Sequence, residues 1–143
     1  MKTSAANKHC LQILVSKFPD AAIKRIMIVD ANDDVSLTFK IVLTESDKRL
    51  RIRSFNDPIY ALREFKPDFY HLVIIDTLLP NMDGFELYNQ LRKLDSNVKI
   101  CFMTTEDEEF VKEAFPEFDP TCFIKKPIAN EDLLKWVEAL ELE

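Results

Sequence analysis

The amino-acid sequence predicts a doubly wound α/β domain with a five-stranded parallel sheet. Five short apolar segments alternate with five segments of helical periodicity, which is the pattern of consecutive βαβ units. Most of the apolar segments are continuous, as expected for strands that are covered on both faces. At 143 residues, the chain has the length of a single domain.

The five expected strands span residues 26–29, 51–55, 72–75, 99–103 and 122–125. The second of them alternates polar and apolar residues, which predicts a position at the edge of the sheet. The other four are more continuously apolar and are expected nearer the centre. Right-handed crossovers between such strands give a flavodoxin-like three-layer sandwich, (βα)₅, with strand order 2-1-3-4-5.

Helices are expected between and after these strands. The first spans about 34–46, and the second opens with Asp57 and Pro58, a capping residue followed by proline at the first helical position, and ends at Pro67. The third and fourth open with capping-box-like patterns that begin at Asp83 and Thr105. The fourth stops before residue 116, and the fifth spans about 130–140.

The first 22 residues lie outside this unit, which we place at 23–143. Leu11, Leu14, Val15 and Phe18 recur at helical spacing and predict a short amphipathic helix that Pro19 stops. This extension packs on the domain, contacts a partner or forms a tail, and the sequence leaves these alternatives open.

Composition excludes several classes of protein. The net charge of −6 and the pI of about 5.0 argue against sequence-independent nucleic-acid binding, which depends on a basic surface. No apolar run approaches the ~18 residues of a membrane span, and no secretory signal core is present, so we expect a cytoplasmic chain without membrane insertion. Cys101 and Cys122 lack metal-site spacing and are expected to be buried thiols rather than disulfide partners. His71 opens a strand and is expected to be structural.

Four polar residues follow four of the expected strands. Asp30 follows the first strand, Asp76 the third, Thr104 the fourth, and Lys126 with Pro127 the fifth. In this topology the carboxyl ends of the strands border one crevice, where open α/β sheets bind ligands. The sequence therefore predicts one site that contains two carboxylates, a hydroxyl and an ammonium group.

These motifs resemble the receiver domain of two-component response regulators. Asp76, Pro80 and Gly84 match the family's spacing of aspartate, proline four residues on and glycine eight residues on. The segment from Phe123 to Pro127 resembles its aromatic-x-x-Lys-Pro motif, and Phe102-Met-Thr104-Thr105 resembles its hydroxyl-bearing switch. The likeness covers roughly residues 25–142.

The resemblance implies that Asp76 accepts a phosphoryl group from a histidine kinase or phosphotransfer protein. The chain would then be a phosphoryl acceptor with slow self-dephosphorylation at most, and not a turnover enzyme. Lys126 would pair with Asp76 and then with a phosphoryl oxygen, and Thr104 would donate its hydroxyl to another. Phe123 occupies the aromatic switch position but has no phenolic hydroxyl, so its switching would rest on ring packing. The Lys126–Pro127 bond is expected to be cis by analogy.

Mg²⁺ is the implied cofactor, because a hard cation would offset the charge of the carboxylates and the phosphoryl group. The resemblance assigns it to Asp30, Asp76 and the backbone carbonyl of Leu78. Ala31 stands where the family carries a second acidic residue, so we expect weakened Mg²⁺ binding. Asp33 and Asp34 are alternative ligands, although capping the first helix is the expected task of either.

The expected protein is a stand-alone receiver that signals by contact with a downstream protein, because no output domain follows the last predicted helix. The expected contact surface combines the helix that opens near residue 105, the strand at 122–125 and the helix at 130–140. A pseudo-receiver, a binding module with impaired metal binding and phosphorylation, is the alternative that Ala31 supports. The sequence does not fit a haloacid-dehalogenase-like phosphatase, because Leu78 stands where the second aspartate would be required. It does not fit a flavodoxin-like FMN carrier either, because no phosphate-binding loop follows the first strand.

Overall fold

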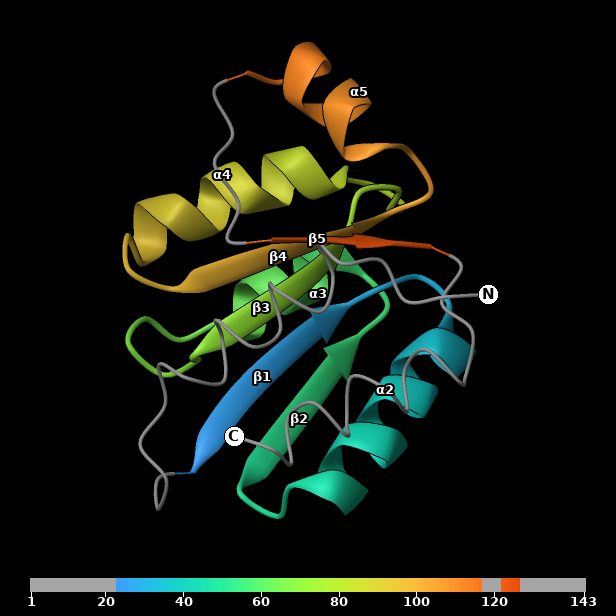
Figure 1. Ribbon diagram of the computed structural model, residues 1–143. Coiled ribbons are helices and arrows are strands. Elements are labelled where there is room, and N and C mark those ends of the chain that lie inside the picture. Colours follow the sequence, from blue (N-terminus) through green and yellow to red (C-terminus); the bar gives the residue numbers. More distant parts are fainter. Residues whose placement is uncertain (1–22, 117–121, 127–143) are drawn as a thin grey trace.

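The chain folds as a five-stranded parallel sheet with helices on both faces, as seen in a computed structural model that describes residues 23–116 and 122–126 (Figure 1). The strand order is β2-β1-β3-β4-β5, which confirms the predicted doubly wound topology. In chain order the elements are β1 (Lys24–Val29), α2 (Asp33–Ser46), β2 (Leu50–Phe55), α3 (Pro58–Glu64), β3 (Leu72–Asp76), α4 (Gly84–Leu94), β4 (Lys99–Thr104), α5 (Glu108–Ala114) and β5 (Cys122–Lys125).

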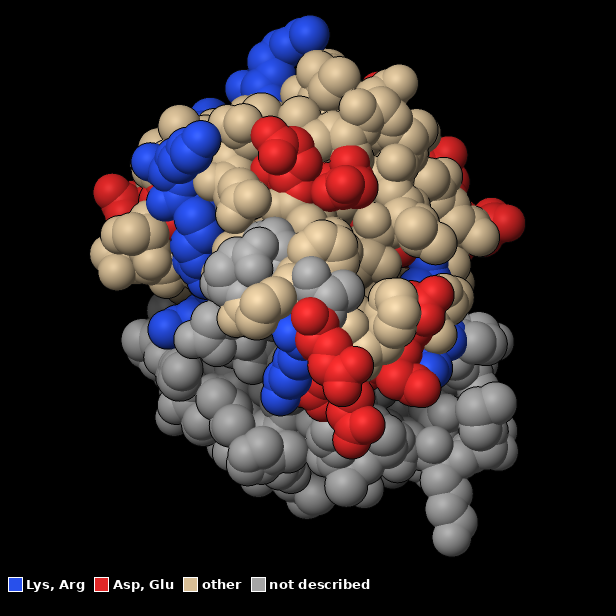
Figure 2. All heavy atoms as spheres, turned by 90° about the horizontal axis from the view of Figure 1, so that it is seen from above, with Lys and Arg blue, Asp and Glu red and all other residues tan. Residues whose placement is uncertain are grey.

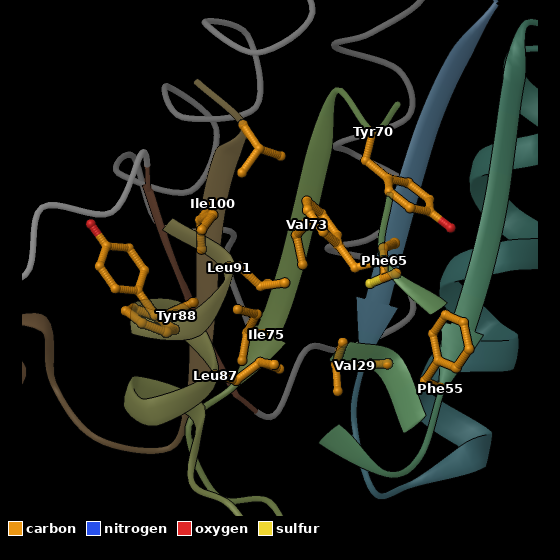
Figure 3. Packing of buried hydrophobic residues seen from close by; sticks show 14 of the residues in the cluster. Val29, Phe55, Phe65, Tyr70, Val73, Ile75, Leu87, Tyr88, Leu91 and Ile100 are labelled. Atoms are coloured by element: carbon orange, nitrogen blue, oxygen red, sulfur yellow. The ribbon is translucent and has the colours of Figure 1, made fainter. Parts of the chain in front are cut away.

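Two hydrophobic clusters, one on each face of the sheet, hold the three layers together. Alternate residues of β1 contribute to opposite clusters: Ile26 and Ile28 pack toward Phe39 and Leu43 of α2, whereas Met27 and Val29 belong to the cluster on the other face. That second cluster includes side chains from α3, α4 and α5, and Figure 3 shows the part of it that lies between α4 and the sheet. The two-residue period of a strand explains this division, because successive side chains point to opposite faces.

The edge position of β2 was also predicted correctly. Leu50 and Ile52 are buried while the intervening Arg51 and the following Arg53 are exposed, so only one face of this part of the strand packs against the core. In contrast, all five residues of β3 are buried, because this strand lies at the centre of the sheet. The observed strands extend the predicted ones by up to two residues.

The starts of the helices agree with the sequence in two cases and differ in two. The Asp57 carboxylate accepts a hydrogen bond from Ile59 N, and Asp83 accepts one from Glu86 N, as their capping patterns predicted. The cap of α2, however, is Asn32, so the expectation that residue 33 or 34 caps this helix was wrong. The cap of α5 is Asp107, which makes no side-chain capping bond, so the capping box at Thr105 was also wrong.

Several expectations concern residues outside the described ranges: the amphipathic helix within 1–22, the helix at 130–140 and the isomer of the bond to Pro127. Among the residues described, no helix is long and apolar enough to cross a membrane. Cys101 is fully buried as expected, but it is disulfide-bonded, so the prediction of a free thiol was wrong at this position.

His71 joins the start of β3 to the start of β1. Its Nδ1 accepts a hydrogen bond from Arg25 N at 2.9 Å, while its own backbone N–H donates to Arg25 O at 2.9 Å. Burial lowers the pKa of His71 below its usual value, and the positive charges of Arg25 and Lys24 lower it further. The imidazole is therefore neutral in the folded protein and acts as a hydrogen-bond acceptor.

We expect this histidine to make the fold less stable in mild acid. A histidine whose pKa is lowered by folding binds more protons when unfolded, so its contribution is complete above pH ~6.5 and declines as the pH falls below that value. Urea unfolding at pH 7.5 and 5.5 measures the effect. His71→Asn, whose side-chain oxygen can replace Nδ1 as the acceptor, should flatten the pH dependence. His9→Asn is the matched control, and an equal flattening in both variants would contradict this assignment.

Candidate functional site

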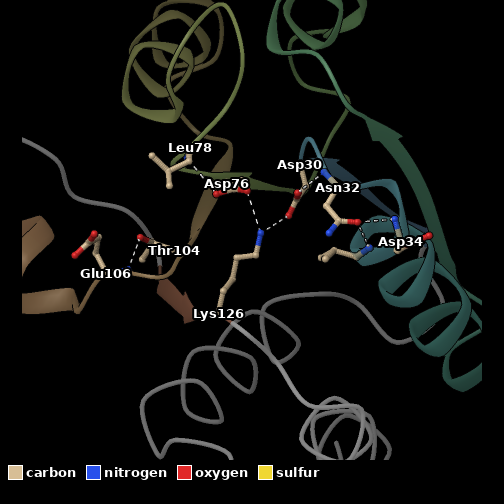
Figure 4. A network of polar contacts seen from close by, with 9 residues as sticks. Asp30, Asn32, Asp34, Asp76, Leu78, Thr104, Glu106 and Lys126 are labelled. Carbon is tan, nitrogen blue, oxygen red and sulfur yellow. Dashed lines mark hydrogen bonds and ion pairs between the residues drawn. The ribbon is translucent and has the colours of Figure 1, made fainter.

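The carboxyl ends of β1, β3 and β5 bring three ionisable side chains together. Val29 of β1 and Ile75 of β3 are register partners. The residues that directly follow them, Asp30 and Asp76, are therefore neighbours at the same edge of the sheet. Lys126 directly follows β5, and its backbone N–H donates to Thr104 O at 2.7 Å. Figure 4 shows the Lys126 side chain reaching between the two carboxylates. Three of the four predicted residues thus meet in one network.

Asp76 is held by the loop that leaves β3. Its Oδ1 accepts a hydrogen bond from Leu78 N at 3.1 Å, and its Oδ2 accepts one from Lys126 Nζ at 3.0 Å. The loop itself is fastened by a bond from Gly84 N to Thr77 O at 3.1 Å and by one from Thr77 N to Met103 O at 3.0 Å. A buried carboxylate on a loop tied at both ends is positioned with little freedom to move.

Gly84 allows this loop to fold tightly against the end of β3. A Cβ atom at this position would lie within 2.8 Å of the Thr77 Cα and closer still to the Asp76 carbonyl oxygen. Both contacts are with backbone, which a change of side-chain rotamer cannot relieve. The chain's only glycine is thus required by close approach, and it places the first turn of α4 directly behind Asp76.

Asp30 is the most deeply buried carboxylate of the site, with 1% of its surface exposed. Its Oδ1 accepts a hydrogen bond from Asn32 N at 2.8 Å, and its Oδ2 accepts one from Lys126 Nζ at 3.0 Å. The Asn32 side chain in turn caps α2 through Asp34 N and Val35 N. Sequence reasoning missed Asn32, although an asparagine immediately before the first helix is a capping signal that could have identified it.

Lys126 is the only described cation that bonds both carboxylates. Burial opposes its charge, but the bonds to Asp30 and Asp76 outweigh that cost and raise the pKa of Lys126 above its ordinary value. The pKa of the Asp76 carboxyl is also raised, first by burial and further by the negative charge of Asp30, against the opposing effects of Leu78 N and Lys126. One ammonium shared between two buried carboxylates does not compensate both, and this leaves the site attractive to a further cation.

Thr104 and Phe123 lie in the same region but outside the ion-pair network. The Thr104 hydroxyl oxygen accepts a hydrogen bond from Glu106 N at 3.0 Å, so it fastens the start of the loop to α5. The Phe123 ring is buried and lies 6.1 Å from the ring of Phe102, centroid to centroid. In this conformation the Asp76 carboxylate is bonded instead by Leu78 N and Lys126 Nζ.

The predicted metal ligands divide into two groups. Asp30 and Asp76 share the site, and oxygen donors of this kind suit Mg²⁺, which uses one or two carboxylates with phosphate oxygen and retained waters. Asp33 instead accepts hydrogen bonds from Asn56 at the surface, and Asp34 is exposed. The described ranges contain no group of three or more His, Cys, Asp or Glu side chains able to hold a metal. The carboxylates of Asp30 and Asp76 are therefore donors of the kind that Mg²⁺ uses.

Comparisons with known proteins bear on the whole domain. The family model of the response regulator receiver domain matches residues 26–138. The regulatory protein VanRB of Enterococcus faecalis is 33% identical over 116 residues, which make up 81% of this chain and 51% of that protein. The chain spans about half the length, or less, of the first curated relatives that it matches.

Solved structures show the same fold. The non-phosphorylated HemR receiver domain of Leptospira biflexa has a TM-score of 0.70 at 23% identity, with 82% of this chain and 94% of that chain covered. A CheY-like receiver domain protein of Methanospirillum hungatei has a TM-score of 0.68 at 24% identity, with 85% and 96% covered. Both likenesses extend over nearly the whole of the compared domains.

Proposed function

The chain belongs to the response regulator receiver domain family, and we propose that its Asp76 accepts a phosphoryl group and thereby switches its contacts with other proteins. The observation that carries this proposal is the buried Asp76 carboxylate, which is held at 3.0 Å from Lys126 on a loop tied to β4 and α4. Positioning and electrostatics supply most of the catalysis in phosphoryl transfer, and both are present here.

In the proposed reaction, an Asp76 carboxylate oxygen attacks the phosphorus of a phosphohistidine on the donor. The new O–P bond forms as the N–P bond breaks, and the bonding pair returns to the imidazole nitrogen, which takes up a proton. The two bonds from Leu78 N and Lys126 Nζ orient the carboxylate for this attack. Mg²⁺, held by Asp30, Asp76 and the Leu78 carbonyl, would offset the added negative charge.

After transfer, Lys126 and Thr104 are the proposed readers of the phosphoryl group. Lys126 would move its bond from Asp76 to a phosphoryl oxygen while it keeps Asp30. The Thr104 hydroxyl, which accepts from Glu106 N in this conformation, would turn to donate to a second phosphoryl oxygen. That turn would release the start of the loop to α5, and Phe123 would repack against Phe102. This series of changes would link the phosphorylation of Asp76 to the surface of α5.

The proposed donor is a histidine kinase or phosphotransfer protein, and the proposed output surface contains α5, β5 and the expected helix at 130–140. On α5, Phe110 is 55% exposed and offers an aromatic anchor of the kind that dominates protein interfaces. Figure 2 views the molecule from the side of α4 and α5 and shows acidic side chains beside basic ones on a largely uncharged surface. Asp107 pairs with Lys125, and Glu108 with Lys112 at 3.4 Å. Two of the acidic residues at the start of α5 are thus already paired, which favours recognition by shape over recognition by charge.

Incubation with a small acyl-phosphate donor and Mg²⁺, followed by intact mass measurement, tests the reaction. We expect one phosphoryl adduct on the wild type and none on Asp76→Asn. Asp83→Asn is the matched control: it makes the same chemical change beside the site, asparagine caps α4 equally well, and the adduct should persist. An adduct on Asp76→Asn would contradict the assignment of the acceptor.

The pseudo-receiver is the second candidate, and it is favoured by Ala31, which stands directly after Asp30 where the family carries a second acidic residue. Absence of an adduct over a wide range of Mg²⁺ concentration would select this alternative. The stand-alone organisation, the boundaries 1–22 and 23–143, and the cytoplasmic location stay predictions.

A further inference from the structure

A basic groove runs along the outer edge of β2, away from the phosphorylation site. It is a cavity of about 320 Å³ lined by residues of β1, β2, α2 and the loop before β3. Its lining includes Arg25, Lys40, Arg51 and Arg53, and none of the described residues that line it is acidic, although the whole chain carries 25 acidic and 19 basic residues. The charged ends of these side chains border a hollow whose own surface is mainly apolar, on a protein whose net charge is −6.

The floor of the groove is apolar and aromatic. The Arg25 guanidinium carbon lies 4.5 Å from the centroid of the Phe69 ring, and Phe69 meets Tyr70 edge to face at 5.0 Å. Arg25 and Arg51 are register partners on neighbouring strands, so their stems lie side by side. Of the four cations, only Arg53 is paired with a carboxylate within the described residues, Glu64 at 3.5 Å on the surface.

Among the described residues, no further strand pairs with the backbone of β2 beside this groove. β2 is the terminal strand of the sheet, as its place in Figure 1 shows. Lys24 N donates to Arg49 O and Asp30 N donates to Phe55 O, so the alternation of a parallel ladder directs Arg51 and Arg53 backbone groups toward β1. The N–H and C=O groups of Ile52 and Ser54 therefore point away from the sheet. The Arg51 guanidinium already donates a hydrogen bond to the Leu50 carbonyl oxygen at 3.0 Å, so the part of the strand edge that could pair with a peptide begins at Ile52.

We propose that the basic groove binds an extended, acidic segment of a partner protein. The segment adds to β2 through the backbone of Ile52 and Ser54, and carboxylates at alternate positions pair with Arg51 and Arg53. A strand presents alternate side chains to the same face, which matches the two-residue spacing of these arginines. Guanidinium groups also hold carboxylates in a bidentate manner, which lysines do not.

Two other roles for the basic groove explain fewer of these observations: a charged edge that only prevents aggregation, and a binding site for nucleic acid. Charged residues on an edge strand discourage aggregation, but that role needs cations only on β2, whereas here they gather from three elements around a hollow with an aromatic floor. A nucleic acid would also meet positive charge in the groove, but the net charge of −6 opposes a long polyanion. A single extended acidic peptide could pair with the arginines and form hydrogen bonds with the outward-facing backbone groups of β2.

Fluorescence anisotropy with the full chain tests the proposal. The probe is a labelled short peptide that alternates glutamate and valine, and the control peptide carries lysine in place of glutamate. We expect binding of the glutamate peptide alone, weakened roughly tenfold by Arg51→Glu and by Arg53→Glu, because each change removes a charge-assisted hydrogen bond. Lys93→Glu, an equal charge change on exposed α4, should leave binding unchanged.

Three outcomes would overturn the proposal: no binding by the wild type, equal binding to Lys93→Glu and the two groove variants, or full competition by free glutamate, which would indicate a small-anion site. Far-ultraviolet circular dichroism verifies that the variants, all changed at exposed positions, remain folded. Asp76→Asn should bind the peptide as the wild type does. The groove is thereby tested independently of phosphorylation.

Discussion

Replacing Ala31 by aspartate is expected to tighten Mg²⁺ binding by about tenfold or more. The site contains two carboxylates, Asp30 and Asp76, and one oxygen of each already accepts a hydrogen bond from Lys126. The other oxygen of each accepts one backbone N–H, from Asn32 or from Leu78. A third carboxylate beside Asp30 would add a hard oxygen ligand and a negative charge, and both favour Mg²⁺. Isothermal titration of the wild type and of Ala31→Asp measures the difference.

The controls separate charge from shape. Ala31→Asn has nearly the same shape as Ala31→Asp but no charge, so it should gain little affinity. Asp30→Asn should lose affinity relative to the wild type, because one of the two existing carboxylates is removed. Equal Mg²⁺ affinities for the wild type and Ala31→Asp would refute the view that residue 31 limits metal binding. Binding is measured here without phosphorylation, so the result does not depend on catalysis.

Gly84→Ala is expected to destabilise the fold by about 1–3 kcal/mol, the usual cost of forcing extra atoms into a packed region. The added methyl group would collide with the backbone at Asp76 and Thr77. Either the loop after β3 or the start of α4 must then move, and the bond from Gly84 N to Thr77 O is strained or lost. Since this loop orients Asp76, phosphorylation should slow as stability falls. Urea unfolding and the rate of adduct formation measure the two effects.

The direction of the stability change in Gly84→Ala is informative, because helix propensity alone predicts that this variant is not destabilised. Alanine is favoured over glycine within a helix by about 1 kcal/mol, so without the collision Gly84→Ala should be neutral or stabilising. Asn89→Ala, at an exposed position of the same helix, is the matched control and should stabilise slightly. If Gly84→Ala stabilised the protein to the same extent, the close approach at residue 84 would not be the reason for the glycine.

The strands were predictable because each carries its own local signal. Burial on both faces requires continuous apolar residues, and this is how β3, with all five residues buried, appears in the sequence. The exposed arginines of β2 gave the opposite signal and placed it at the edge. Capping was less predictable, since Asn32 and Asp107 competed with nearby acidic and hydroxyl residues of similar propensity.

The meeting of Asp30, Asp76 and Lys126 could be predicted from the amino-acid sequence, because each follows an apolar segment and parallel strands of one sheet end at the same edge. How they meet depends on the packing of the whole domain, which places one lysine 3.0 Å from each of two carboxylates and turns Asp33 to Asn56 instead. The basic groove likewise has no signature along the chain. Its cations are separated by up to 28 positions, and strand pairing and helix packing alone bring Arg25 and Arg53 to one surface. Local patterns specify elements, whereas distances between side chains depend on how those elements pack.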